Sequence, residues 1–211
     1  MNFDNFKNKT AKILLDIKAI NIQIKKPFKL TSGKLSPVYV DCRRIISHLK
    51  ERRLIINMSS KLIKKKINLK KINYIAGGET AGIPYASWIS EKLNKPMIYI
   101  RKKPKGFGKN SLIEGDYEEN CKCILIEDLA TDGGSKVKFV ENMRENNIKV
   151  NDTFVIFYYD TFKKEESLLT KLNINIHYLC SWEHILNEVK KEGILSAKDT
   201  MEVEDFLYNS N

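Results

Sequence analysis

The sequence predicts an α/β fold with a doubly wound, mainly parallel sheet and a small N-terminal hood. Strand-like and helix-like segments alternate from residue 47 onward, which is typical of a parallel sheet covered on both faces. An apolar, β-branched run at residues 123–126 leads into a glycine-rich turn and then a helical segment. The 211 residues suffice for one good-sized domain with its own core. We expect a single domain over 1–211, with the hood at 1–46 and the core at 47–195.

The N-terminal part is expected to form one helix and one hairpin. Residues 4–22 have the apolar spacing of an amphipathic helix. Short apolar segments at residues 28–30 and 38–40 flank a polar turn at residues 31–37, which favours a β-hairpin between the two segments. This hairpin would lie over the strand ends of the core as a hood.

The core elements follow in alternation. Helices are predicted at residues 47–66, 84–93, 136–146, 162–172 and 181–190, and strands at residues 74–76, 97–100, 123–126, 153–159 and 174–179. The strands are short and almost wholly apolar, as expected for strands buried on both faces. Pro84 suits the first turn of its helix, and Ser181 is a favourable N-cap. The sequence does not indicate a role for the tail at residues 196–211.

Composition and charge exclude several classes of protein. The net charge of +11 would suit a nucleic-acid-binding protein. However, the lysines are spread widely, and the densest run, residues 61–71, has the spacing of a solvated helix face. No apolar run approaches the roughly 18 residues that span a membrane, and the N-terminus lacks a signal-peptide core. The four cysteines and three histidines have neither disulfide-framework nor metal-ligand spacing. We expect a cytoplasmic protein without nucleic-acid or membrane partners.

The stretch CKCILIEDLATDGGSK at residues 121–136 predicts a phosphate site. Its glycine-rich turn, residues 131–135, would bring backbone N–H groups to the N-terminus of a helix, where an anion is favoured. Glu127 and Asp128 stand where the strand should emerge from the sheet. Carboxylates repel phosphate but accept hydrogen bonds from sugar hydroxyls. The implied ligand is a ribose with a 5′-phosphate.

Two further segments are expected at the same edge of the sheet. The glycine-rich turn at residues 77–82 could be a tight turn only, or a second anion site at a helix start. The polar segment at residues 101–120 could be an exposed basic loop. Twenty polar residues without structure inside a compact domain more often form a lid, and this one is rich in lysine. A cationic lid can neutralise a diphosphate leaving group and exclude water.

These motifs carry a resemblance to a known family. ILIEDLATDGGSK resembles the phosphoribosyl diphosphate (PRPP) signature of the type I phosphoribosyltransferases. FKLTSGKLSPVYVDCR (residues 28–43), AGGETAGIPYA (76–86) and YIRKKPKGFGKNSLIEG (99–115) resemble, in order and spacing, the orotate phosphoribosyltransferase family. The resemblance covers the chain from about residue 28 to residue 136.

The resemblance implies transfer of a 5-phosphoribosyl group from PRPP to N1 of orotate. The products would be orotidine 5′-monophosphate and pyrophosphate, in de novo pyrimidine biosynthesis. It also implies Mg²⁺ held through PRPP, with no direct protein ligand, and a homodimer in which each lid reaches the neighbour's site.

Site residues are carried over position by position. The PRPP site would comprise Arg101, Lys102, Lys105, Glu127, Asp128, Leu129, Ala130, Thr131, Asp132, Gly133, Gly134 and Ser135. Lys105 and Asp128 would be the catalytic residues among them. The pyrophosphate-side turn would be Glu79, Thr80, Ala81 and Gly82. Orotate would be bound by Thr131, Lys34 and Tyr39, with Lys34, Arg43 and backbone N–H groups as candidates for its carboxylate.

Three positions depart from the pattern of the family. Phe107 stands where many members carry a lid histidine, Thr31 where some carry a lysine, and Thr161 where some carry an arginine. Two other functions share parts of the pattern. A phosphoribosyltransferase for a purine would keep the phosphate site and differ in the hood. A nucleic-acid-binding regulator would keep the PRPP site without the chemistry, but it would not need a cationic lid.

Overall fold

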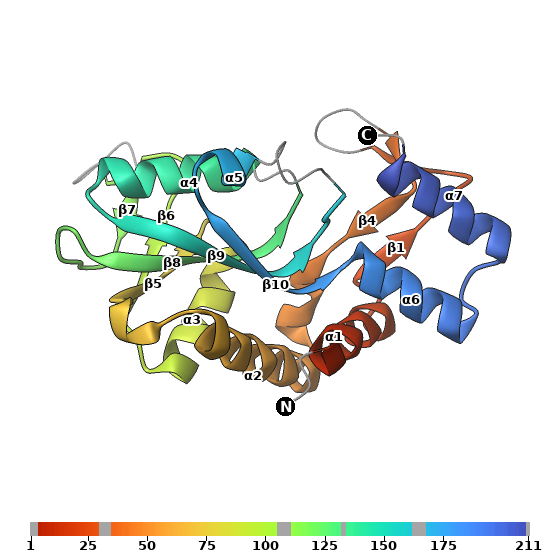
Figure 1. The fold of residues 1–211 in the computed structure, drawn as a ribbon, viewed down its shortest axis with the longest axis horizontal. Helices are drawn as coiled ribbons and strands as arrows, with labels where there is room; N and C mark the ends of the chain where they lie inside the picture. Colours follow the sequence, from red (N-terminus) through yellow and green to blue (C-terminus); the bar gives the residue numbers. More distant parts are fainter. Residues whose placement is uncertain (1–3, 30–34, 105–110, 132–133, 162–167, 210–211) are drawn as a thin grey trace.

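The centre of the molecule is a six-stranded sheet (Figure 1). The computed structural model describes residues 4–29, 35–104, 111–131, 134–161 and 168–209. The strands, in spatial order, are β10 (Asn175–Ser181), β9 (Lys149–Tyr158), β8 (Lys122–Ala130), β5 (Tyr74–Gly78), β6 (Met97–Ile100) and β7 (Ile113–Glu114). All neighbours pair in parallel except β7, which is antiparallel to β6. The predicted α/β class with a mainly parallel sheet is confirmed.

Helices cover both faces of this sheet (Figure 1). One face carries α1 (Asp4–Asp16), α2 (Leu49–Lys66), α3 (Gly82–Leu93) and α6 (Trp182–Glu192), and the other carries α4 (Gly134–Glu145) and α5 (Leu168–Lys171). Each face has its own apolar cluster, with Ile124 and Ile126 of β8 on the first side and Leu125 on the second. This alternation along β8 is the two-residue period of a strand buried on both faces. In the described ranges, no helix combines the length and apolarity needed to cross a membrane.

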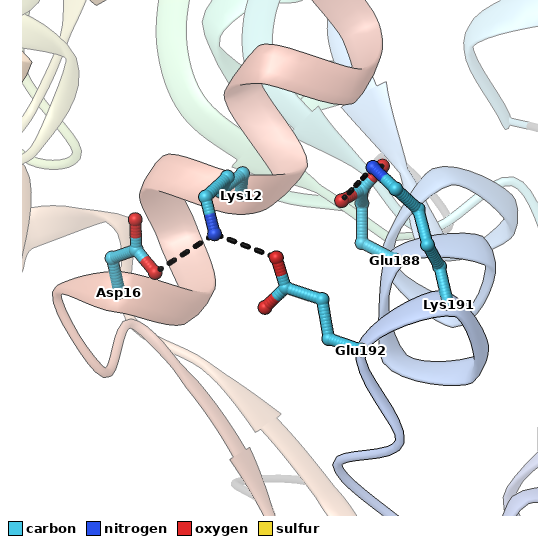
Figure 2. A network of polar contacts seen from close by, with 5 residues as sticks. All are labelled: Lys12, Asp16, Glu188, Lys191 and Glu192. Carbon is cyan, nitrogen blue, oxygen red and sulfur yellow. Dashed lines mark hydrogen bonds and ion pairs between the residues drawn. The ribbon is translucent and has the colours of Figure 1, made fainter.

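The first helix docks against α6 near the other end of the chain. Leu14 and Trp182 are completely buried in the shared core. At the rim, Lys12 Nζ lies 2.6 Å from Glu192 Oε1, and Lys191 pairs with Glu188 within α6 (Figure 2). Because the Lys12 and Glu192 side chains are largely in water, this ion pair contributes little stability, and burial of the apolar face holds the two helices together.

The hood differs from the predicted hairpin. Strand β4 (Val38–Val40) pairs with β1 (Ile20–Ile22), whereas β2 (Phe28–Lys29) pairs with β3 (Leu35–Ser36). The predicted pairing of 28–30 with 38–40 is therefore wrong, and so is the helix over 4–22, since α1 ends at Asp16. Lys18 has a left-handed backbone (φ 55°), which stops the helix and turns the chain into β1.

Several element boundaries also differ from the prediction. Strand β8 continues to Ala130, so the acidic pair lies within the strand and not beyond its end. Strand β5 likewise includes Gly77 and Gly78, and α4 begins at Gly134 rather than Lys136. The polar segment 101–120 contains the short strand β7, which buries Ile113.

Other parts extend or limit the predicted picture. Two 3₁₀ helices, η1 (Cys42–Ser47) and η2 (Leu69–Lys71), flank α2, and the tail forms a helix that was not predicted, α7 (Ala197–Tyr208). Of the helix predicted at 162–172, α5 covers 168–171, and residues 162–167 lie outside the described ranges.

The direction of winding reverses between two central strands. From β5 the chain moves to β6 on one side, and from β8 it moves to β9 and β10 on the other. In open parallel sheets, ligands bind at the carboxyl ends of strands at such a reversal. The candidate site is therefore expected where β5 and β8 end.

Candidate active site

The ends of β5 and β8 are joined by the side chain of Glu127. Its Oε2 atom lies 3.1 Å from Nζ of Lys136 in the first turn of α4, and both side chains are 7% exposed. Its Oε1 atom packs so closely against Gly78 and Gly82 that a Cβ atom added at either glycine would lie 2.4 Å from it. Glycine is thus required at both positions for the carboxylate to fit between the two strands.

Burial dominates the electrostatics of the acidic pair. Desolvation raises the pKa of Glu127 to about 7; the ammonium of Lys136 opposes this rise, and the charge of Asp128 adds to it. The pKa of Asp128 is also raised by burial, and among the opposing charges Lys136 comes first, followed by Arg43 of the hood. Two adjacent buried carboxylates therefore share one buried cation.

The turn at residues 79–82 is tied to the segment that follows β6, which the sequence predicts as the base of a lid. Glu79 Oε2 accepts a 2.7 Å hydrogen bond from the backbone N–H of Lys102, and the N–H of Glu79 donates to the carbonyl of Ile100 at 2.9 Å. Beside them, the Arg101 guanidinium lies 3.8 Å from Glu114 of β7. The structure thus places Arg101 and Lys102 next to the turn at 79–82.

The hood approaches from the other side of the acidic pair. Tyr85 of α3, fully buried, donates a 2.6 Å hydrogen bond to the carbonyl of Cys42, which fixes η1 against the core. The next residue, Arg43, donates to Asp41 at 2.7 Å and to the hydroxyl of Tyr39 at 3.0 Å. Arg43 and Tyr39, both of which are predicted to contact orotate, therefore lie together. Arg43 is also close enough to Asp128 to oppose the rise in the pKa of that carboxyl group.

The structure describes both ends of the segment that the sequence predicts as a phosphate cradle. Leu129 and Ala130 complete β8, Thr131 follows it and is exposed, and Gly134 and Ser135 open α4. Asp132 and Gly133 lie outside the described residues, as do Lys34, Lys105, Phe107 and Thr31. Thr161 is described and follows Asp160, whose carboxylate accepts a 3.1 Å hydrogen bond from the hydroxyl of Tyr178.

The sequence analysis assigns no role to two residues of this site, Lys136 and Tyr85. Lys136 is predicted there only as the start of a helix, although a cation in a first helical turn is disfavoured by the helix dipole. Tyr85 lies in the motif AGGETAGIPYA. Its bond to the hood joins residues 43 positions apart, which no local pattern predicts.

The fold is similar to those of solved structures. Leishmania donovani UMP synthase matches with a TM-score of 0.80 and 28% identity over 95% of this chain, which spans 42% of that longer chain. Orotate phosphoribosyltransferase from Aeropyrum pernix matches with a TM-score of 0.73 and 26% identity, covering 88% of this chain and 99% of that one. No family model matches the sequence.

Fold and site together define a type I phosphoribosyltransferase. The orotate phosphoribosyltransferase of Roseobacter denitrificans is 42% identical over 200 residues, which cover 95% of this chain and 89% of that protein. The chain belongs to the orotate phosphoribosyltransferase family, which comprises transferases of pyrimidine biosynthesis. The resemblance found in its motifs is confirmed.

Proposed function

We propose that the chain transfers the 5-phosphoribosyl group of PRPP to N1 of orotate, releasing pyrophosphate and orotidine 5′-monophosphate. The observation that carries this proposal is the convergence of three features where the winding reverses. The acidic pair, the turn at 79–82 and the cationic base of the lid all meet at the ends of β5 and β8. The acidic pair suits the hydroxyls of a ribose, and the turn at 79–82 together with the cationic lid base suits its diphosphate.

The residue roles follow from charge. Glu127 and Asp128 would accept hydrogen bonds from the ribose hydroxyls, and the segment from Ala130 to Ser135 would hold the 5′-phosphate at the N-terminus of α4. The turn from Glu79 to Gly82 would lie beside the pyrophosphate. Arg101, Lys102 and Lys105 would neutralise that leaving group. Thr131, Tyr39 and Lys34 would contact orotate, with Arg43 beside Tyr39 as a further cation for its carboxylate.

The chemistry demands little beyond electrostatics and positioning. Departure of pyrophosphate leaves positive charge on the ribose, as in glycoside cleavage. Cations on the lid stabilise the departing anion, and the cradle holds the ribose in place for attack by the base. Orotate N1 is nucleophilic when deprotonated, so the mechanism requires no dedicated general base.

Mg²⁺ is part of this proposal. Mg²⁺ usually binds through substrate phosphates while keeping several waters. In keeping with the family resemblance, the ion would be bound through PRPP without a direct protein ligand. When bound, it would supply positive charge to the pyrophosphate group.

We further propose a cytoplasmic homodimer in which each lid acts at the neighbour's site. The support is the resemblance of residues 99–115 to the lid segment of the family, which in that family reaches the site of the neighbouring subunit. Arg101 and Lys102 are anchored through Glu79 and Glu114, and the cationic sequence from Lys103 onward continues from that anchor.

An orotate turnover assay tests the proposed reaction. The protein is mixed with PRPP, Mg²⁺ and either orotate or a purine base, and the absorbance of each base is followed. Loss of orotate absorbance that requires PRPP is expected. Turnover of a purine without turnover of orotate would overturn the proposal, and binding of PRPP without turnover of any base would favour a regulator.

A further inference from the structure

Lys136 is buried at a place that disfavours a cation. It is the third residue of α4, where the partial positive charge of the helix N-terminus opposes an ammonium group. Its side chain is nonetheless only 7% exposed, at a distance of 3.1 Å from Glu127. A lysine almost never occupies such a position unless a carboxylate balances it. The role of Lys136 must therefore involve the acidic pair.

The surroundings of the pair show what Lys136 controls. The charges that act on Glu127 come from Lys136 of α4, Asp128 of β8 and Lys102 after β6, and its Oε1 atom faces Gly78 and Gly82. The charges on Asp128 come first from Lys136 and then from Arg43. In both cases Lys136 is the strongest influence that favours the ionised form.

The ionisation state matters because it determines what the pair can bind. A carboxylate only accepts hydrogen bonds, whereas a carboxylic acid also donates one. Ribose hydroxyls bind best to two full acceptors. The second oxygen of Glu127, Oε1, is buried and has no hydrogen-bond partner among the described residues, so the contact of Oε2 with Lys136 is what balances the charge of this carboxylate.

We propose that Lys136 is a positioning residue for PRPP: its ammonium favours the ionised forms of Glu127 and Asp128 and holds Glu127 in place, so that both carboxylates can accept the ribose hydroxyls. This inference rests on the proposed function. It gives a role to a residue outside the segments proposed to hold the phosphate and the leaving group.

Binding of PRPP measured by calorimetry as a function of pH tests the inference. The variants are Lys136→Met, Lys136→Arg and, as a matched control, Lys138→Met, which removes an exposed lysine from the same helix. For Lys136→Met, we expect affinity at neutral pH to fall roughly tenfold for each unit by which the carboxylate pKa rises, with recovery toward the wild-type value near about pH 9. Lys136→Arg should retain most of the affinity, and Lys138→Met should follow the wild-type profile, because the titration of PRPP itself is common to all.

Other outcomes would separate the possible failures. A uniform loss in Lys136→Met at every pH, or no loss, would overturn the inference. Failure of the wild-type protein to bind PRPP would overturn the proposed function instead. If Lys136→Met does not fold by circular dichroism, Glu127→Gln/Lys136→Met replaces it, compared with Glu127→Gln alone. The same recovery at high pH is then expected from Asp128, and its absence would count against the inference.

Discussion

The backbone N–H of Lys102 donates a hydrogen bond to the carboxylate of Glu79, at 2.7 Å. The N–H of Glu79 in turn donates to the carbonyl of Ile100 at 2.9 Å. Glu79 therefore holds the turn after β5 against the end of β6 through both its side chain and its backbone N–H. If Lys102 reaches PRPP as proposed, Glu79 fixes where the lid begins.

Removing this link should impair the lid without unfolding the protein. For Glu79→Ala we expect kcat/KM for PRPP to fall by about tenfold, the usual value of one hydrogen bond to a charged group. Glu79→Gln should lose much less, because its amide oxygen can still accept from Lys102. Steady-state kinetics with varied PRPP compare the two variants. Equal losses would mean that charge, and not the hydrogen bond, is what Glu79 contributes.

The two glycines against Glu127 should respond differently to an added methyl group. In Gly82→Ala the Cβ atom would meet both Glu127 Oε1 and the backbone carbonyl of Ile126 at 2.4 Å, and the carbonyl cannot move without disrupting β8. In Gly78→Ala the three nearest atoms all belong to the side chains of Glu127 and Phe139, which can adjust. We expect both to destabilise the fold, by about 1–3 kcal/mol for Gly78→Ala and more for Gly82→Ala. Urea unfolding measures both; the reverse order would contradict the packing described.

The buried ion pair should be costly to break and inexpensive to replace. Lys136→Met leaves Glu127 without its cation, and we expect a loss of stability that is small near neutral pH and grows toward about 3–5 kcal/mol as pH rises and the buried carboxyl group must ionise. Glu127→Gln/Lys136→Met removes both charges and should recover most of this loss. A double variant no more stable than Lys136→Met would show that the pair is not the source of the loss. Urea unfolding of the single and double variants provides the comparison.

The same pair predicts a pH dependence of stability. The pKa of Glu127 is about 7 in the folded chain, compared with an ordinary value of 4.5. The folded state therefore binds the extra proton between these values, so the contribution of Glu127 to stability is fully present below the lower value and is lost as pH rises through the upper one. The unfolding free energy of Glu127→Gln/Lys136→Met relative to wild type should consequently rise over this range. A difference in unfolding free energy that does not change with pH would contradict the raised pKa of Glu127.

Lys105 should contribute more to turnover than Lys103. We expect Lys105→Ala to lower turnover by about 10²–10³-fold, the usual cost of losing one electrostatic contact to the transition state. Lys103→Ala, an exposed lysine of the same segment, should change turnover much less. Unchanged thermal unfolding of both would show that folding is preserved. Near-normal turnover of Lys105→Ala would remove Lys105 from the lid assignment.

Mixing two inactive variants tests the shared site. Lys105→Ala and Asp128→Asn each remove a proposed catalytic residue. If the lid acts across a dimer, a mixed dimer regains one site with both residues intact, and the mixture should recover part of the activity. No recovery after exchange of subunits, verified by mass spectrometry, would place both residues in the same subunit's site.

The strands of the core could be predicted because burial on both faces leaves a continuous apolar run. Residues 97–100 were predicted as a strand, and β6 has these bounds. Ser181 was predicted as an N-cap, and its backbone N–H and hydroxyl both contact His184 Nδ1 in a capping box. Local chemistry of this kind is visible in the sequence.

Features that depend on distant partners could not be predicted. The end of β8 was placed too early because Glu127 and Asp128 are charged, yet Lys136 and pairing with β9 keep them in the strand. The pairing of the hood strands depends on which short segments meet in space. The tail helix α7 is different, since Thr200, Val203 and Leu207 are buried with helical spacing that the sequence already displayed.

The contact of Glu127 with Gly78 and Gly82 has a consequence for engineering and divergence. One carboxylate occupies a volume bordered by three separate segments, so these positions are exchangeable only as a set. A shorter acid at position 127 would relieve the contact at 78, leaving the ring of Phe139, whereas position 82 would still require glycine because of the carbonyl of Ile126. Transplanting this strand, with its glutamate, into a relative with a larger residue at 78 would therefore succeed only if the turn after β5 were transplanted with it.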